Sequence, residues 1–182
     1  MRVITGSARG RKLITLEGDD VRPTTDIVKE ALFSIIQFEI EGRKVLDLFG
    51  GSGQLAIEAL SRGADSAVIV DLSKKSVEVI KQNLEHTGFS KKAVVVQSDA
   101  LSFLSRRTEK YDIAFLDPPY SKGILEAALG RVHEVMNEGG VIICEAPFKD
   151  ELPEEAGKFR LQKKYRYGKT GLFLYRCAVE EE

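Results

Sequence analysis

Four consecutive residues, Asp117-Pro118-Pro119-Tyr120, could together perform chemistry on an amine. They follow Tyr111–Leu116 directly, an apolar run typical of a strand that is buried on both faces. Two prolines cannot donate ladder hydrogen bonds, so the strand must end there, and their fixed φ angles hold two carbonyls beside a carboxylate and a ring. Asp117 and the Pro118 carbonyl could accept both N–H bonds of an exocyclic base amine while Tyr120 stacks on the base. The tetrapeptide therefore predicts a catalytic site for base-amine methylation, with a simple proline turn as the alternative.

A glycine-rich turn, Asp47-Leu-Phe-Gly-Gly-Ser-Gly53, follows an earlier predicted strand. Glycines let the backbone approach a ligand closely at the carboxyl end of a strand. The run Gly51–Ala56 also matches the dinucleotide fingerprint, so a nicotinamide cofactor stays open at this point. Asp71 follows the glycines by roughly 20 residues and suits a ribose diol in either cofactor. Asp47 favours S-adenosylmethionine, because its carboxylate can hold an ammonium group but would repel a pyrophosphate.

A third cofactor contact is predicted at Ser98-Asp99-Ala100, after the next strand, where Asp99 could accept from an adenine amino group. The alternative for Asp71 and Asp99 is that each caps the helix that follows it, although capping and ligand binding are compatible. The residues predicted to contact S-adenosylmethionine are Asp47, Phe49, Gly50, Gly51, Ser52, Gly53, Asp71, Leu72, Asp99, Ala100 and Asp117.

From Lys44 onward, predicted strands and helices alternate, and this order would position the loops. Such alternation predicts a parallel, doubly wound α/β sheet with right-handed crossovers. After Pro147 the pattern changes to two strands separated by Gly168–Gly171, an antiparallel hairpin on the sheet edge. This is the Rossmann-like class I methyltransferase layout, with seven strands, mainly parallel. The predicted strands are 45–48, 67–71, 93–97, 112–116, 141–146, 159–167 and 172–177, and the predicted helices are 54–61, 74–86, 100–107 and 124–136.

Two short β-rich runs precede this pattern, Arg2–Thr5 and Lys12–Leu16, and predict a β-hairpin with a basic loop. Pro23 and Thr24-Thr25 then introduce an amphipathic helix. We therefore expect an N-terminal hairpin extension at residues 1–22, in contact with RNA, and a methyltransferase domain at residues 23–182.

The bulk composition is that of one globular domain, with 182 residues, 43% hydrophobic content and a formal net charge of −1. No apolar run is long enough to span a membrane, and no signal peptide is evident. Cys144 and Cys177 lack metal-ligand spacing, and His86 and His133 lack partner histidines, so no metal site and a reducing cytosol are expected. A monomer is the default expectation.

The charges are distributed unevenly, because the segment from Lys158 to Cys177 carries seven basic residues and no acid. Such a separation of sign can build a basic face on a neutral protein, although solvated strand faces explain it equally well. The residues predicted to contact RNA are Arg9, Arg11, Lys12, Arg22, Thr24, Lys164, Arg166 and Lys169.

Nearly the whole chain resembles the RsmD-like family of bacterial 16S rRNA guanine-N2 methyltransferases. The motifs that carry the resemblance are Arg22-Pro-Thr-Thr-Asp26 with Val28–Phe33, Asp47-Leu-Phe with Gly51-Ser-Gly53, Glu58–Ala64, Asp117–Tyr120 and Tyr167–Gly171. The chain departs from the family at Gly50, where alanine is common, at Ala56, where glycine is common, and at Ile27, which replaces a basic residue.

The resemblance implies methyl transfer from S-adenosylmethionine to N2 of one guanine of 16S rRNA, within an assembling small subunit. Other amino-methyltransferases remain alternatives, acting on adenine N6 in DNA, on another rRNA guanine, or on a protein glutamine, although glutamine methylases normally carry asparagine at position 117. From a different class, an inactive RNA-binding or assembly factor with a relic methyltransferase fold is a further alternative. A nicotinamide oxidoreductase would leave Asp117–Tyr120 unexplained.

Overall fold

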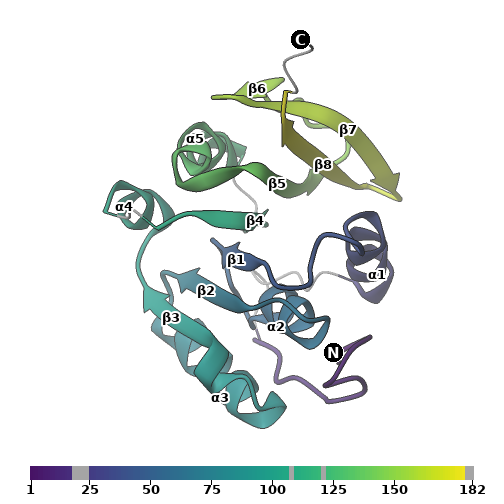
Figure 1. Ribbon diagram of the computed structural model, residues 1–182, viewed down its shortest axis with the longest axis vertical. Helices are drawn as coiled ribbons and strands as arrows, with labels where there is room; N and C mark the ends of the chain where they lie inside the picture. Colours follow the sequence, from purple (N-terminus) through teal and green to yellow (C-terminus); the bar gives the residue numbers. More distant parts are fainter. Residues whose placement is uncertain (18–24, 107–108, 120–121, 179–182) are drawn as a thin grey trace.

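The fold is a single eight-stranded sheet with helices on both faces (Figure 1), seen in a computed structural model that describes residues 1–17, 25–106, 109–119 and 122–178. The order of strands across the sheet is β3-β2-β1-β4-β5-β8-β7-β6. The strands are β1 (Lys44–Asp47), β2 (Ser66–Asp71), β3 (Ala93–Gln97), β4 (Tyr111–Leu116), β5 (Met136–Pro147), β6 (Glu155–Ala156), β7 (Phe159–Tyr167) and β8 (Thr170–Cys177).

The first five strands are parallel, and β8, β7 and β6 continue the sheet in antiparallel pairs. The α/β class and the C-terminal hairpin are therefore confirmed. The sheet has eight strands rather than the predicted seven, because the two residues of β6 pair with Arg160 and Phe159 at the start of β7. A strand of two residues has no alternation of side chains that a sequence pattern could reveal.

Helices pack on the two faces as separate groups. The helices are α1 (Asp26–Ile35), α2 (Gln54–Ser61), α3 (Lys74–Thr87), α4 (Ala100–Ser105) and α5 (Lys122–Val132), with short 3₁₀ turns at Ser90–Lys92 and His133–Val135. One core cluster joins α1, α2 and α3 to one face of the sheet, and the other joins α4 and α5 to the opposite face. Adjacent residues of β4 divide between these clusters, with Ile113 in the first and Ala114 in the second, which confirms a strand buried on both faces. None of the helices in the described residues is long and apolar enough to cross a membrane.

The predicted N-terminal hairpin is present, but its pairing is shorter than predicted. One antiparallel bridge joins Arg2 to Lys12, where the N–H of Val3 donates to the Arg11 carbonyl and the N–H of Leu13 donates to the Met1 carbonyl. After Val3, the backbone groups of the first arm bind helix α2. The N–H groups of Ile4 and Thr5 donate to the Glu58 carboxylate, and the N–H of Ser7 donates to the Ser61 carbonyl. Residues 1–17 therefore lie along the body as an irregular arm (Figure 1), which we call the N-terminal arm.

Candidate active site

The predicted site residues gather at the carboxyl edge of the parallel strands, where β1 lies between β2 and β4. Asp47, the last residue of β1, pairs with Ile69 of β2 and Phe115 of β4. The loops that follow these three strands therefore meet at one place, the position at which open α/β sheets bind ligands. Asp117, 70 positions after Asp47 in the sequence, enters the same site because β4 ends at Leu116 as predicted.

The glycine loop connects β1 to α2 through a conformation that needs its glycines. Gly51 has φ +59° and Gly53 has φ +82°, both in the left-handed region. A Cβ atom on Gly50 would lie 2.5 Å from Cγ2 of Ile69, so this chain's Gly50 is fitted to its own isoleucine neighbour. The N–H of Gly50 donates to the Val70 carbonyl, which holds the loop against the end of β2.

Asp71 fixes the loop from the neighbouring strand. Its Oδ2 accepts from the N–H of Gly51 and its Oδ1 accepts from the N–H of Ser73, each at 2.9 Å. The helix cap that was the alternative role for Asp71 belongs instead to Ser73, whose hydroxyl accepts from the N–H of Ser76. Leu72 presents an apolar side chain beside this carboxylate, with 69% of its surface exposed.

Asp47 is the least usual group of the site, because it is a carboxylate that is only 1% exposed. Among the described residues, neither of its oxygens has a hydrogen bond of good geometry. Burial raises the pKa of Asp47 to about 7, and the charges of Asp117 and Asp71 add to the effect. The N–H groups of Phe49 and Ala56 oppose this rise but only partly offset it. A buried acceptor of this kind fits a cationic partner, such as the ammonium of a methionine moiety.

Gln54 is a second buried acceptor, which the sequence interpretation missed. It is the first residue of α2, it is 7% exposed, and its Oε1 has no partner among the described residues. Its position directly after the glycine loop could have suggested it, because a polar residue there faces the ligand edge of the sheet.

Asp99 behaves as a helix cap, which was the alternative that the sequence left open. Its Oδ1 accepts from the N–H of Ser102 at 3.0 Å, and this hydrogen bonding lowers the pKa of the exposed carboxyl. Ala100 is buried behind it. A contact between Asp99 and the adenine remains a prediction, which capping does not contradict.

In the catalytic tetrapeptide, Asp117 and Pro118 are half-buried and Pro119 is exposed, while Tyr120 lies outside the described residues. Ser52 is buried, Phe49 is half-buried against the second core cluster, and Gly53 caps α2. The described residues among the predicted catalytic and cofactor contacts thus lie in the loops at the ends of β1, β2, β3 and β4.

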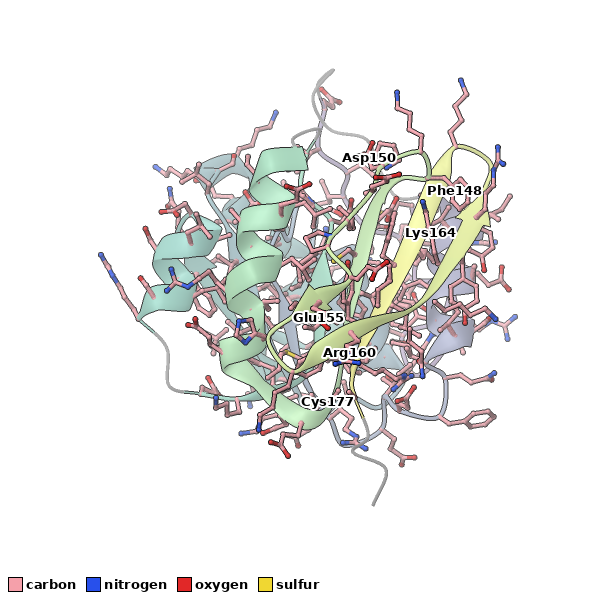
Figure 2. The ribbon with its side chains drawn as sticks, turned by 90° about the horizontal axis from the view of Figure 1, so that it is seen from above. Phe148, Asp150, Glu155, Arg160, Lys164 and Cys177 are labelled. Carbon is pink, nitrogen blue, oxygen red and sulfur yellow. The ribbon has the colours of Figure 1, made fainter. Side chains whose placement is uncertain are left out.

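The predicted RNA contacts fall into two groups that the structure does not bring together. The turn of the β7–β8 hairpin lies beside the catalytic edge, because Thr170 pairs with Pro147 at the end of β5. There, Lys164 is half-buried, with Nζ bonded to the Asp150 carbonyl and 4.2 Å from the centre of the Phe148 ring (Figure 2). Arg166 and Lys169 are exposed, and Arg166 donates to the Gly168 carbonyl.

The basic residues of the N-terminal arm lie farther from Asp117. Arg9, Arg11 and Lys12 are exposed, and Arg11 donates to the carbonyl of His86 near the C-terminal end of α3. The tip of the arm contacts Ser61, the last residue of α2, whereas the glycine loop lies at the other end of this eight-residue helix, about 12 Å away. Arg22 and Thr24 lie outside the described residues.

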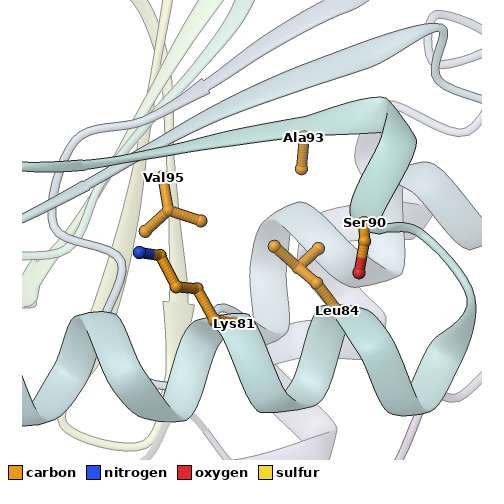
Figure 3. A pocket seen from close by; sticks show the side chains of 5 residues that line it. All are labelled: Lys81, Leu84, Ser90, Ala93 and Val95. Carbon is orange, nitrogen blue, oxygen red and sulfur yellow. The ribbon is translucent and has the colours of Figure 1, made fainter.

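A separate hollow lies between α3 and the edge strand β3 (Figure 3). Its lining residues are Lys81, Leu84, Ser90, Ala93 and Val95, and none of them belongs to the predicted site. These five lining residues include no carboxylate and no residue of the glycine loop.

The fold is that of the class I methyltransferases. Three features define it, which are the parallel strands with β1 between β2 and β4, the antiparallel C-terminal hairpin, and the ligand-binding edge after β1. The family model described as "Conserved hypothetical protein 95" matches residues 1–176. The chain belongs to this family, that of ribosomal RNA small subunit methyltransferase D.

Three relatives illustrate this similarity. The Bacillus subtilis protein named "Putative rRNA methyltransferase YlbH" is 41% identical, over 97% of this chain and 98% of its own. "Ribosomal RNA small subunit methyltransferase D" of Escherichia coli is 33% identical, over 100% of this chain and 92% of its own. The solved structure of "Putative methyltransferase yhhF" from Escherichia coli is 33% identical and superposes with a TM-score of 0.87, covering 99% of both chains.

Proposed function

We propose that the protein transfers a methyl group from S-adenosylmethionine to N2 of a guanine in 16S rRNA. The observation that carries this proposal is the buried carboxylate of Asp47 at the end of β1, next to the loop of Asp117. Within the described part of the chain, this Asp47 carboxylate has no hydrogen bond of good geometry. The family and the names of its rRNA methyltransferase relatives support RNA as the substrate. The proposal also specifies guanine N2 as the methylated atom and an assembling small subunit as the substrate. It further includes a monomeric state and a cytoplasmic location.

Each element of the site has a role in holding the cofactor. Asp47 would accept the ammonium, the loop Gly50–Gly53 would approach the methionine part, and Asp71 would accept from the ribose hydroxyls. Leu72 would cover one face of the adenine. The cofactor supplies a methyl group that is already activated on a sulfonium, so the protein has mainly to position the two reactants.

Asp117 and the Pro118 carbonyl would orient the guanine amine. By accepting its two N–H bonds, they draw the nitrogen lone pair out of conjugation and aim it at the methyl group. A strong base is unnecessary, because the amine becomes acidic only after it has gained the methyl group. The base must leave its stack to reach Asp117, and the basic residues would hold the RNA backbone without reading its sequence.

The test is radiolabelled methyl transfer to small subunits that lack the modification, beside naked 16S rRNA, DNA and protein, with Asp117→Ala as the control. We expect N2-methylguanine at one site, formed far more slowly by the variant. Label on adenine N6 of DNA or on a protein glutamine would replace the proposed substrate. Absence of label on every acceptor, despite cofactor binding, would support the inactive assembly factor.

A further inference from the structure

Asn83 is a fully buried amide that the proposed chemistry does not use. Asn83 lies on α3 and is 0% exposed. The Oδ1 of Asn83 accepts from the N–H of Ile14 at 2.8 Å, and the Nδ2 of Asn83 donates to the Ile14 carbonyl at 3.0 Å. The same Nδ2 donates to the Ser52 carbonyl at 2.9 Å. One side chain thus joins the N-terminal arm to the glycine loop.

The contacts of Ser52 make this junction specific. Besides its carbonyl bond to Asn83, the Ser52 hydroxyl donates to Sδ of Met1 at 3.4 Å. Met1 in turn accepts, through its carbonyl, from the N–H of Leu13. Met1 therefore contacts Ser52 directly and Ile14 reaches it through Asn83, and Ser52 precedes Gly53 inside the proposed cofactor loop.

The tip of the arm is held differently, by the buried side chains of Glu58 and Ser61 on α2. Glu58 accepts from Ile4 and Thr5, and Ser61 accepts from Ala8 and donates to the Thr5 carbonyl. None of these contacts involves the glycine loop. A change at the loop would therefore reach Met1 through the Ser52 hydroxyl and Ile14 through Asn83, and Ile14 is the contact from which the chain leads on to Arg22 and Thr24.

We propose that Asn83 is a positioning residue that couples the cofactor loop to the N-terminal arm, so that cofactor binding orders the arm for RNA. This inference rests on the proposed function, because it assumes that the glycine loop holds S-adenosylmethionine and that the arm contacts RNA. A ligand that selects one conformation of the Ser52 backbone also selects the position of Ile14, since both are bonded to one amide. Coupling of this kind is reciprocal, so RNA bound to the arm should increase cofactor affinity by the same factor.

The first test is amide hydrogen exchange on the unaltered chain, with and without S-adenosylhomocysteine as the probe. We expect added protection at the N–H of Ile14, with a smaller change at Ile4 and Thr5, whose N–H groups donate to Glu58. Equal changes at all three positions would mean uniform stabilisation and would overturn the coupling. An unchanged Ile14 in the presence of bound probe would overturn it as well.

The second test measures cofactor affinity with and without 16S rRNA in Asn83→Ala and in a matched control, Thr87→Ala. Thr87 is buried one turn later on α3, and within the described residues its hydroxyl donates only to the Asn83 and Leu84 carbonyls of its own helix. We expect Asn83→Ala to lower the affinity for S-adenosylhomocysteine about tenfold, the equivalent of one lost buried hydrogen bond. We also expect RNA no longer to raise this affinity in the variant. Thr87→Ala should keep the effect of RNA, and a loss in both variants would contradict a specific role for Asn83.

Failure of the proposed function has a different signature. If the unaltered chain binds neither S-adenosylhomocysteine nor S-adenosylmethionine, both the proposed function and this inference fall. If it binds the probe and methylates rRNA while Ile14 exchanges as before, only the coupling falls.

Discussion

The N–H of Gly51 donates a hydrogen bond of 2.9 Å to Oδ2 of Asp71, which ties the glycine loop to the end of the neighbouring strand. In the proposed site this one carboxylate would have two functions, to hold the loop and to accept from the ribose hydroxyls. A carboxylate oxygen carries two lone pairs, so Oδ2 can accept from Gly51 and from a hydroxyl group at the same time.

Asp71→Ala should weaken S-adenosylmethionine binding more than Asp71→Asn. Asparagine can still accept from the Gly51 N–H through its amide oxygen, whereas alanine leaves that N–H unpaired and frees the loop. We expect a loss of about tenfold for asparagine and about a hundredfold for alanine, from one or two hydrogen bonds, measured by calorimetric titration. Equal losses would show that the bond to Gly51 contributes nothing to binding.

Asp117→Ala should reduce turnover about 10²- to 10³-fold, comparable with the loss of one preorganised polar group in other enzymes. Asp117→Asn should retain more activity, because its amide oxygen can still accept from the base amine. The measurement is single-turnover methyl transfer at saturating RNA and cofactor. Identical losses in the two variants would contradict the role of Asp117 as an acceptor.

The raised pKa of Asp47, about 7, makes cofactor binding depend on pH. A bound ammonium favours the carboxylate form, so binding below pH 7 releases a proton, and affinity should rise with pH by up to about tenfold per unit until it levels near 7. Asp47→Asn should flatten this dependence and weaken binding. A wild-type affinity that is constant between pH 5 and 8 would argue against a cationic partner for Asp47.

The same shift has the opposite consequence for the stability of the ligand-free protein. The pKa of Asp47 is 3.8 in the unfolded chain and higher in the fold, so the fold binds more protons between these values. The stability that protonated Asp47 contributes is fully present below pH 3.8 and is lost as the pH rises to about 7. Relative to the wild type, Asp47→Asn should therefore become more stable across this interval, as denaturant titrations at several pH values would show.

Alanine at Arg166 and Lys169 should reduce RNA affinity more than alanine at Arg9, Arg11 and Lys12, because the hairpin turn lies beside the catalytic edge. Each phosphate contact that is lost should lower the slope of log affinity against log salt by about 0.7 to 0.9. Cofactor affinity without RNA should stay the same in both sets. Lys91→Ala with Lys92→Ala, at the amino end of β3, provides a matched control for loss of charge, and an equal effect there would indicate non-specific attraction.

Glu58→Ala should destabilise the fold by about 3–5 kcal/mol, the range for breaking a buried ion pair. Glu58 and Lys29 are both 0% exposed with their charged groups 3.9 Å apart, and the burial of Lys29 lowers its pKa. Glu155→Ala removes a carboxylate from the exposed pair with Arg160 (Figure 2) and should cost less than about 1 kcal/mol. Similar midpoints of urea unfolding for the two variants would contradict this ranking.

The parts of the molecule that follow a local pattern were predictable from sequence. The strand β7 and the helix α2 occupy the predicted residues, because alternation, apolar content and turn residues define them locally. The site followed from one topological rule, that the loops after Asp47, Asp71 and Leu116 share an edge once their strands are parallel.

Features that depend on contacts between distant residues were not predictable. Glu58 and Asn83 look like ordinary polar residues of amphipathic helices, and only the folded chain shows that they bind the arm. The arm itself matches a hairpin in sequence because its β-rich runs flank a glycine-bounded loop. The side chains on α2 and α3 that bind its backbone lie 53 to 69 positions away, beyond any local pattern.

The last strand of the chain is not the last strand of the sheet. β8 lies between β5 and β7, although it follows both along the chain. During synthesis, β6 and β7 emerge before β8. They are joined to the rest of the sheet only through β8, so they cannot pair with it until residues 170–177 have been synthesised. Contacts this distant in sequence are slow to form. A nascent chain that stops before Thr170 would expose the edge of β5, so we expect such truncated products to be substrates for chaperones and proteases.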